Sequence, residues 1–273
     1  MGIPIGAVPA PLPKSTKEQL VVTAERLFAT HGIDAVSLRQ ICLEAGNANT
    51  SAVQYHFGSK ERLLQAIFEH RIPHLMARRH LLAADAISRG EINNIRTALM
   101  VQFLPLVEQA ELEDSFYMTF VSQLGHSRQS EHPYRRLPAE YRANVERYQT
   151  HLHELLRHLP AVVRRHRIQA VTAMCNLACA AREQARRLGA ERMLPYGLHV
   201  ELLFDALLGI IDAPLSPATA SAVRLLGDDP DPDLGLNPWL LLSDGPAVSG
   251  PEGQADRPGH SGSSTIDPPI GSR

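Results

Sequence analysis

The chain has 273 residues, of which 44% are hydrophobic and 21% are charged, and its formal net charge at pH 7 is −2. This length and composition are those of a globular protein that can bury a sizeable core. No apolar run reaches the roughly 18 residues that a membrane helix needs, so we expect no membrane partner. Residues 1–13 hold several prolines and no basic run. They predict a flexible leader rather than a signal peptide, and hence a cytoplasmic protein.

The three cysteines, Cys42, Cys175 and Cys179, are too few and too unevenly spaced for a disulfide framework. Cys175 and Cys179 lie four residues apart, which places them on one face of an expected helix. Two ligands alone do not make a zinc site. We therefore expect buried apolar filling at these positions, with no metal and no cofactor.

The charge is unevenly distributed along the chain. Residues 228–273 carry eight acidic and two basic residues, a net −6, which leaves +4 on residues 1–227. The same 46 residues contain eight Pro and seven Gly, a composition typical of disordered chain. We expect a disordered acidic tail over 228–273, in which the apolar run 238–242 (PWLLL) stands apart.

Between residues 15 and 227 the hydrophobic pattern is helical throughout, which predicts an all-α protein. The first helix is expected over 17–31, with Thr16 and Gln19 as a capping box and Gly32 as its end. Short helices are expected from Ser37 and over 50–56, and a fourth starts after Ser59 and runs towards Pro73, where we expect a kink. Further helices are expected over 93–110, 114–128, 138–159, 161–188, 196–212 and 217–226.

Residues 37–57 (SLRQICLEAGNANTSAVQYHF) have the spacing of a helix-turn-helix, with Gly46 in the turn. In such a motif the second helix enters the major groove of DNA. Ala52, Val53 and Phe57 are the apolar positions that would anchor this helix to the body. The polar positions would face outward, and Gln54 could pair with the N6 and N7 atoms of adenine.

The stretch from about residue 16 to residue 71 resembles the DNA-binding domain of the tetracycline-repressor (TetR) family. The resemblance lies in AERLFATHG (24–32), SLRQICLEAGN (37–47) and SAVQYHFGSKERLLQAI (51–67). It implies an N-terminal three-helix DNA-binding domain over 14–71 and a larger helical effector-binding and dimerisation domain over 72–227. The Asn-Ala-Asn turn and Gln54 depart from the common family pattern and leave the operator sequence open.

By the same resemblance, DNA contacts fall on the start of the second helix, on the recognition helix and on the head of the fourth helix. The corresponding residues are Arg39, Asn49, Thr50, Ser51, Gln54, Tyr55, His56 and Lys60. Residues 14–71 carry a net charge of only +1. We therefore expect the cations Lys14, Lys17, Arg39 and Lys60 to share one face.

The implied partners are double-stranded DNA with a palindromic operator, a second copy of the chain, and a small-molecule effector of unknown identity. Helices 161–188 and 196–212 are the candidates for the dimer face, since the first is rich in small residues and the second in leucine. The effector would bind among the helices of 59–159. The aromatic and polarisable residues there are either pocket lining or ordinary core: Phe103, Phe116, Tyr117, Met118 and Phe120.

The sequence favours a DNA-binding regulator, with a repressor as the expected type, over an enzyme. The segment 153–158 (HELLRH) is one residue longer than the HExxH motif of zinc proteases, so its two histidines point in different directions. His151 and His158 do share a helix face with Glu154 between them. This group is either a metal site or a solvated, weakly basic face. A second hypothesis is a helical ligand-binding or scaffold protein whose helix-turn-helix does not engage DNA.

Overall fold

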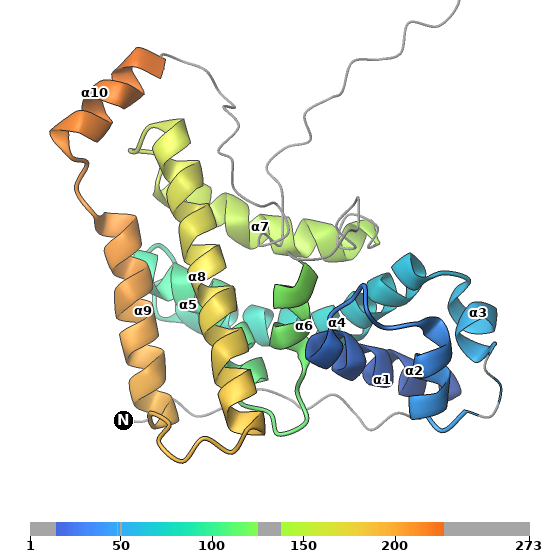
Figure 1. The fold of residues 1–273 in the computed structure, drawn as a ribbon. Helices are drawn as coiled ribbons and strands as arrows, with labels where there is room; N and C mark the ends of the chain where they lie inside the picture. Colours follow the sequence, from blue (N-terminus) through green and yellow to red (C-terminus); the bar gives the residue numbers. More distant parts are fainter. Residues whose placement is uncertain (1–14, 48, 50, 125–137, 227–273) are drawn as a thin grey trace, which may run out of the picture. The chain divides into compact units, whose positions relative to one another are not determined.

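The computed structural model describes residues 15–47, 49, 51–124 and 138–226, which all lie in one unit of the chain. The described residues form helices and no strands, which confirms the expected all-α class (Figure 1). The helices are α1 (Thr16–His31), α2 (Leu38–Glu44), α3 (Ala52–Phe57), α4 (Lys60–Ser88), α5 (Ile95–Ala110), α6 (Tyr117–Leu124), α7 (Ala139–Leu155), α8 (Ala161–Arg187), α9 (Tyr196–Asp212) and α10 (Pro217–Leu226).

Side-chain caps set the starts of the first, second and fourth helices. The backbone N–H of Gln40 donates to Ser37 Oγ (3.1 Å) and that of Arg62 donates to Ser59 Oγ (3.2 Å), as the sequence predicts. The cap of α1 lies one residue earlier than the sequence suggests, because Ser15 and not Thr16 accepts the N–H of Glu18 (3.2 Å). Ser15 takes the extended conformation that a capping residue needs, whereas Thr16 is already helical.

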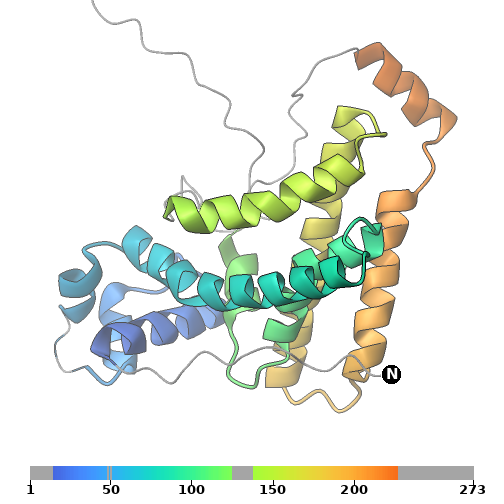
Figure 2. The same cartoon turned by 180° about the vertical axis from the view of Figure 1, so that it is seen from behind.

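Helix α4 continues as far as Ser88, through Pro73, where the sequence predicts a kink. Buried residues on both sides of the proline hold it, with Ile72 before Pro73 and Leu75 and Met76 after it. Tertiary packing therefore outweighs the loss of one helical hydrogen bond at the proline. In Figure 2 this helix leads from the α1–α3 end of the described body towards α5.

An aromatic cluster joins the N-terminal helices to α6. The ring of Phe28 on α1 stacks with Phe120 on α6 at 6.3 Å, and Phe68 on α4 meets Phe120 at 5.7 Å and Tyr117 at 6.1 Å. All four side chains are at most 1% exposed. Phe103, Tyr117, Met118 and Phe120, for which the sequence left pocket lining and ordinary core open, are all buried here.

Ion pairs with buried carboxylates tie α4 to α1 and to α5. Arg71 on α4 donates two hydrogen bonds of 2.7 Å to the carboxylate of Glu25 on α1, and both residues are buried. Burial raises the pKa of the Glu25 carboxyl, and Arg71 opposes that shift. Arg78 on α4 makes a similar two-bond pair with Glu108 on α5, at 2.8 and 2.7 Å. Such pairs fix which helix faces which, because an unpaired buried charge is costly.

Glu183 on α8 organises the start of α6. Its buried carboxylate accepts hydrogen bonds from the backbone N–H groups of Met118 (3.2 Å) and Thr119 (2.7 Å), and from the hydroxyls of Ser115 and Thr119 (both 2.6 Å). A negative charge at a helix N-terminus satisfies its free N–H groups and its dipole. Helix α6 is therefore fixed to α8 at one end while it packs against α1.

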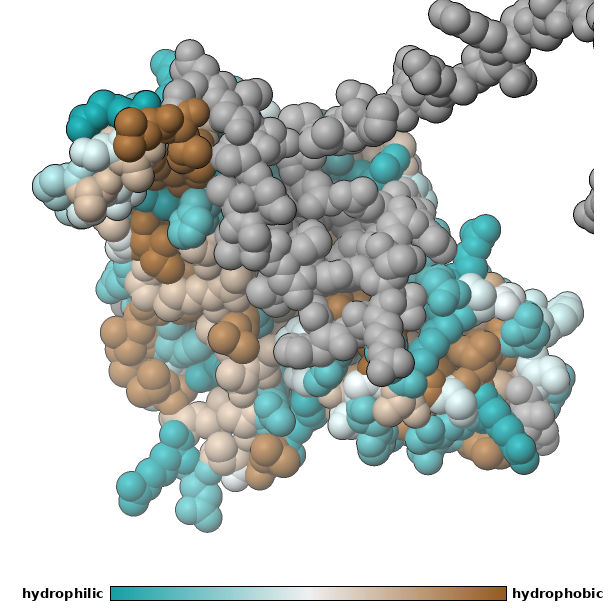
Figure 3. All heavy atoms as spheres, turned by 45° about the horizontal axis from the view of Figure 1, so that its top comes forward, coloured by the Kyte–Doolittle hydropathy of each residue, from teal (hydrophilic) through white to brown (hydrophobic). Residues whose placement is uncertain are grey.

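Helices α8 and α9 pack side by side, at the opposite end of the described body from α2 and α3 (Figures 1 and 2). Their outward sides leave large apolar residues exposed, including Leu177 (67%), Leu188 (77%) and Leu202 (50%). In Figure 3 brown apolar side chains recur on the side where α9 and α10 lie in Figure 1. We define the α8–α9 face as the following exposed residues: Met174, Leu177, Ala181, Gln184, Leu188, Leu198 and Leu202.

Cys175 and Cys179 are both fully buried on the inner side of α8, with their sulfur atoms 3.9 Å apart. The neighbouring Cys175 thiol and burial raise the pKa of the Cys179 thiol, so it stays protonated and behaves as an apolar group. Within the described residues, no group of three or more His, Cys, Asp or Glu side chains is placed to hold a metal ion. Among the described helices, none combines the length and apolar character needed to cross a membrane.

Candidate DNA-binding surface

Helices α2 and α3 are joined by a turn that reverses the chain at Gly46. The φ angle of Gly46 is 68°, in the left-handed region that side chains disfavour. Its N–H donates to the carbonyl of Leu43 (3.0 Å), and the N–H of Asn47 donates to the carbonyl of Cys42 (3.0 Å). This arrangement ends α2 and turns the chain towards α3, as the motif requires.

Two asparagine side chains build the remainder of the turn. Asn47 Oδ1 accepts the backbone N–H of Asn49 (3.0 Å), and Asn49 Oδ1 accepts the N–H of Ser51 (3.0 Å). Asn49 therefore orders the start of α3 with the same oxygen that could have met DNA. The sequence analysis missed this role, although asparagine two residues before the bonded position is the pattern of an Asx turn.

Helix α3 has one buried side and one exposed side. Ala52 (4% exposed) and Val53 (0%) pack into the core, whereas Gln54, Tyr55 and His56 are exposed. Tyr55 is 84% exposed, and its ring meets that of His56 edge-on at 5.1 Å. A tyrosine held so far out of the core presents its ring and hydroxyl to whatever approaches α3.

Among the remaining predicted contact residues, Ser51 directly precedes α3 and makes no side-chain capping bond there. Its hydroxyl is exposed, as is the side chain of Arg39 in the first turn of α2. Arg26 on α1 donates to Glu44 at the end of α2 (3.1 Å), a solvent-exposed pair that links these helices. Thr50 lies outside the described residues.

The cations near α3 do not all point outward. Lys60 Nζ donates to the backbone carbonyl of Val36 (2.7 Å) and lies over the ring of Phe28 at 5.5 Å. Burial lowers the pKa of its ammonium, and Asp34 and Glu61 oppose this shift. Lys17 Nζ lies 5.8 Å from the centre of the Phe57 ring, at the end of α3. Lys60 thus stabilises the motif through its bond to the Val36 carbonyl, while Lys17 places a positive charge beside α3.

The structure therefore brings Gln54, Tyr55 and His56 together on the exposed side of α3, with Ser51 exposed directly before the helix. The set offers hydroxyl, amide and imidazole groups, which can bond phosphate oxygens and base edges. A short polar helix on an apolar base, preceded by a second helix across a glycine turn, defines a helix-turn-helix DNA-binding protein.

Comparison with known proteins supports this class. Residues 20–67 match the family described as bacterial regulatory proteins, tetR family, a segment that runs from α1 through the turn and α3 into α4. Residues 20–67 therefore form a DNA-binding segment of the tetR-family type. Among curated proteins, none matches the chain.

Similar solved structures include three with low sequence identity. The superantigen PfiT is 19% identical with a TM-score of 0.41, covering 75% of this chain and 100% of its own. The fatty acid degradation regulator FadR from Bacillus halodurans is 17% identical with a TM-score of 0.43, covering 73% and 97%. The TetR family transcriptional regulator PfmR from Thermus thermophilus is 17% identical with a TM-score of 0.34, covering 78% and 94%.

Proposed function

We propose that this regulator is a homodimeric repressor that binds a palindromic operator through α3 and is released by a small-molecule effector. In this proposal the protein and its DNA lie in the cytoplasm, and the protein acts by binding rather than by catalysis. The observation that carries it is the division of α3 into a buried apolar side at Ala52 and Val53 and an exposed polar side at Gln54, Tyr55 and His56.

In this proposal α3 lies in the major groove and Gln54 reads a base edge, with adenine as its best partner. Ser51, Tyr55 and His56 hold the flanking phosphates together with Thr50 and Arg39. Asn49 contributes by ordering the start of α3, since its side-chain oxygen accepts the Ser51 N–H. Lys60 acts mainly through its bond to Val36, which fixes the head of α4 against the loop before α2.

The α8–α9 face supports the dimer. Its exposed positions on α8 recur every three to four residues, as they do on one side of a helix, and Leu198 and Leu202 on α9 repeat the spacing. Two such helices from each protomer would form a four-helix interface. A dimer is also what specificity requires, because one short helix reads few bases and two copies set about 34–36 Å apart read two half-sites.

We place the effector among the helices that follow the DNA-binding domain, near Arg79 and Gln102. Both residues are 2% exposed, and Arg79 Nε donates to the backbone carbonyl of Gln102 (3.0 Å). The side-chain oxygen Oε1 of Gln102 is buried and has no hydrogen-bond partner within the described structure. A buried acceptor left without a donor is costly, and a ligand that donates to it would recover that energy. Effector binding would then shift the population towards a spacing of the two α3 helices that misfits the operator.

The test of DNA reading uses the paired substitution Gln54→Ala and Tyr55→Ala. We expect the unaltered protein to retard its own promoter fragment in a sequence-specific manner and the double variant to lose this retardation while remaining a dimer. Arg89→Ala is the matched control, because it removes an exposed cation at the far end of α4. Selection of bound DNA from a random pool would report half-site sequence and spacing together. If the unaltered protein selects no sequence, the scaffold hypothesis replaces the repressor.

A further inference from the structure

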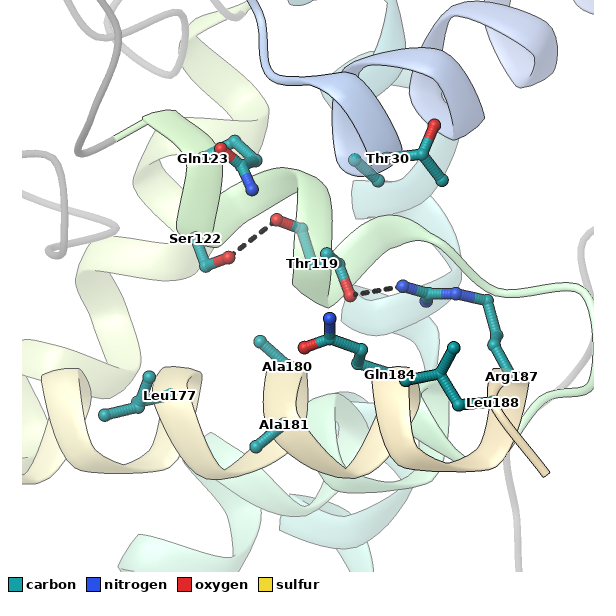
Figure 4. A pocket seen from close by; sticks show the side chains of 11 residues that line it. Thr30, Thr119, Ser122, Gln123, Leu177, Ala180, Ala181, Gln184, Arg187 and Leu188 are labelled. Carbon is teal, nitrogen blue, oxygen red and sulfur yellow. Dashed lines mark hydrogen bonds between the residues drawn. The ribbon is translucent and has the colours of Figure 1, made fainter. Parts of the chain in front are cut away.

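A hollow of about 350 Å³ opens between the end of α1, α6 and the C-terminal half of α8 (Figure 4). Thr30 borders it from α1, and Ser122 and Gln123 border it from α6. On the α8 side Ala180 and Ala181 lie between Leu177 and Leu188, and Gln184 and Arg187 add two polar side chains. The hollow therefore touches the DNA-binding domain at one edge and the α8–α9 face at the other.

The hollow does not suit a charged ligand. Of the side chains that line it, Arg187 alone is charged, and its guanidinium is already engaged. It donates to Glu183 Oε2 (3.1 Å), to Thr119 Oγ1 (3.1 Å) and to the carbonyl of Ser115 (3.3 Å), and it lies 4.5 Å over the ring of Phe116. The absence of free charge is instead a property that the hollow shares with the centre of a protein interface, where charged residues are depleted.

The lining overlaps the α8–α9 face. Leu177, Ala181, Gln184 and Leu188 belong both to that face and to the hollow. A molecule seated on the face would therefore also lie over the hollow. In a two-fold dimer each protomer presents the same patch to the other, so both hollows would be covered together.

We propose that a second copy of this chain fills the hollow, so that the partner covers Thr30 at the end of α1. This inference rests on the proposed dimer and extends it from α8 and α9 to α6 and to the DNA-binding domain itself. The partner would then hold each DNA-binding domain directly, and the spacing of the two α3 helices would be set at α1 as well as at the α8–α9 face.

The test is the rate at which a cysteine placed in the hollow reacts with N-ethylmaleimide. Thr30 is exposed in the single protomer, and the three native cysteines are buried, so Thr30→Cys introduces one reactive thiol. At concentrations where the chain is dimeric we expect the thiol to react about tenfold more slowly than in the same variant carrying Leu177→Asp and Leu202→Asp, since a covered thiol reacts only when the interface opens. Gln19→Cys, on an exposed position of the same helix, should react equally fast in both backgrounds.

A second variant gives an independent measurement. Thr30→Trp should raise the dimer dissociation constant about tenfold by blocking the hollow, an effect of the size that truncating one important interface residue has, whereas Gln19→Trp should leave it unchanged. Equal labelling of the Thr30→Cys thiol in both backgrounds, with the dimer intact by sedimentation, would overturn the inference and leave the dimer standing. A chain that is monomeric at every concentration would instead refute the dimer and the inference with it.

Discussion

Glu25 and Arg71 form a two-point ion pair in the interior between α1 and α4, with both N–O distances at 2.7 Å. The two residues are 46 apart in sequence and join α1 to α4. Because neither side chain is exposed to water, each charge depends on the other for its stability.

We expect Arg71→Met to lower the free energy of unfolding by about 3–5 kcal/mol, because it leaves the Glu25 carboxylate buried without a cation. Urea denaturation followed by circular dichroism would measure the loss. The double variant Glu25→Leu with Arg71→Met should recover most of it, since neither charge remains. A double variant as unstable as the single one would contradict this account.

Gly46→Ala should cost about 1 kcal/mol of stability, because alanine must adopt the left-handed conformation found there. Thermal unfolding would detect the change, and Gly46→Asn should cost less, since asparagine tolerates that conformation. Gly197 in α9 is the control, as its backbone carries no positive φ and a Cβ there would meet no atom within 4 Å. Equal losses from Gly46→Ala and Gly197→Ala would argue against a special role for the turn.

Substitutions at Lys60 and Arg39 distinguish a structural role from a contact with DNA phosphate. Its ammonium donates to the Val36 carbonyl, so we expect Lys60→Met to lower stability but to leave the salt dependence of DNA binding unchanged. Arg39→Ala, by contrast, should reduce the slope of log affinity against log salt concentration by about 0.9 for each phosphate that the variant no longer neutralises. Fluorescence anisotropy at several salt concentrations would measure both slopes. A fall in slope for Lys60→Met would show that the lysine leaves Val36 to reach DNA.

Stability should decline as the pH falls below about 6.5, in part through His70. Burial lowers the pKa of His70 below its ordinary value of 6.5, and Arg71 and His74 act in the same direction. The unfolded chain therefore binds a proton that the folded protein resists, and the stability present above pH 6.5 is lost as the pH falls through the folded pKa. The melting temperature of His70→Gln should fall less between about pH 7.5 and 5.5 than that of the unaltered protein. His166→Gln, at an exposed position, should follow the unaltered protein.

The helices could be predicted from the sequence because their signals are local. Ser37 and Ser59 cap helices as expected, Gly32 ends α1, and the apolar spacing of α8 and α9 matches their observed extents. The full length of α4 was harder to predict, since Pro73 is a local signal for a kink and the packing that carries the helix on to Ser88 comes from residues distant in sequence.

The candidate DNA-binding surface was predictable in outline but not atom by atom. The exposure of Gln54 and Tyr55 follows from the apolar pattern of α3, whose anchors are Ala52 and Val53. The inward turn of Lys60 could not be foreseen, because its acceptor is a backbone carbonyl 24 residues away. The hydrogen bond from the Thr119 N–H of α6 to Glu183 likewise joins residues 64 apart in sequence, and hydrophobic periodicity does not predict such a contact.

The unbroken course of α4 has a mechanical consequence. At 1.5 Å per residue its 29 residues form a rod roughly 43 Å long. The rod begins directly after the recognition helix, and further along the ion pair between Arg78 and Glu108 holds it to α5. A tilt of about 5° around that ion pair would move the head of the rod by roughly 2–3 Å, taking the 1.5 Å rise over the intervening residues. A displacement of about 1.3 Å at the distal end of the rod, ten residues from Arg78, would thus nearly double at its head, where the protein meets the double helix.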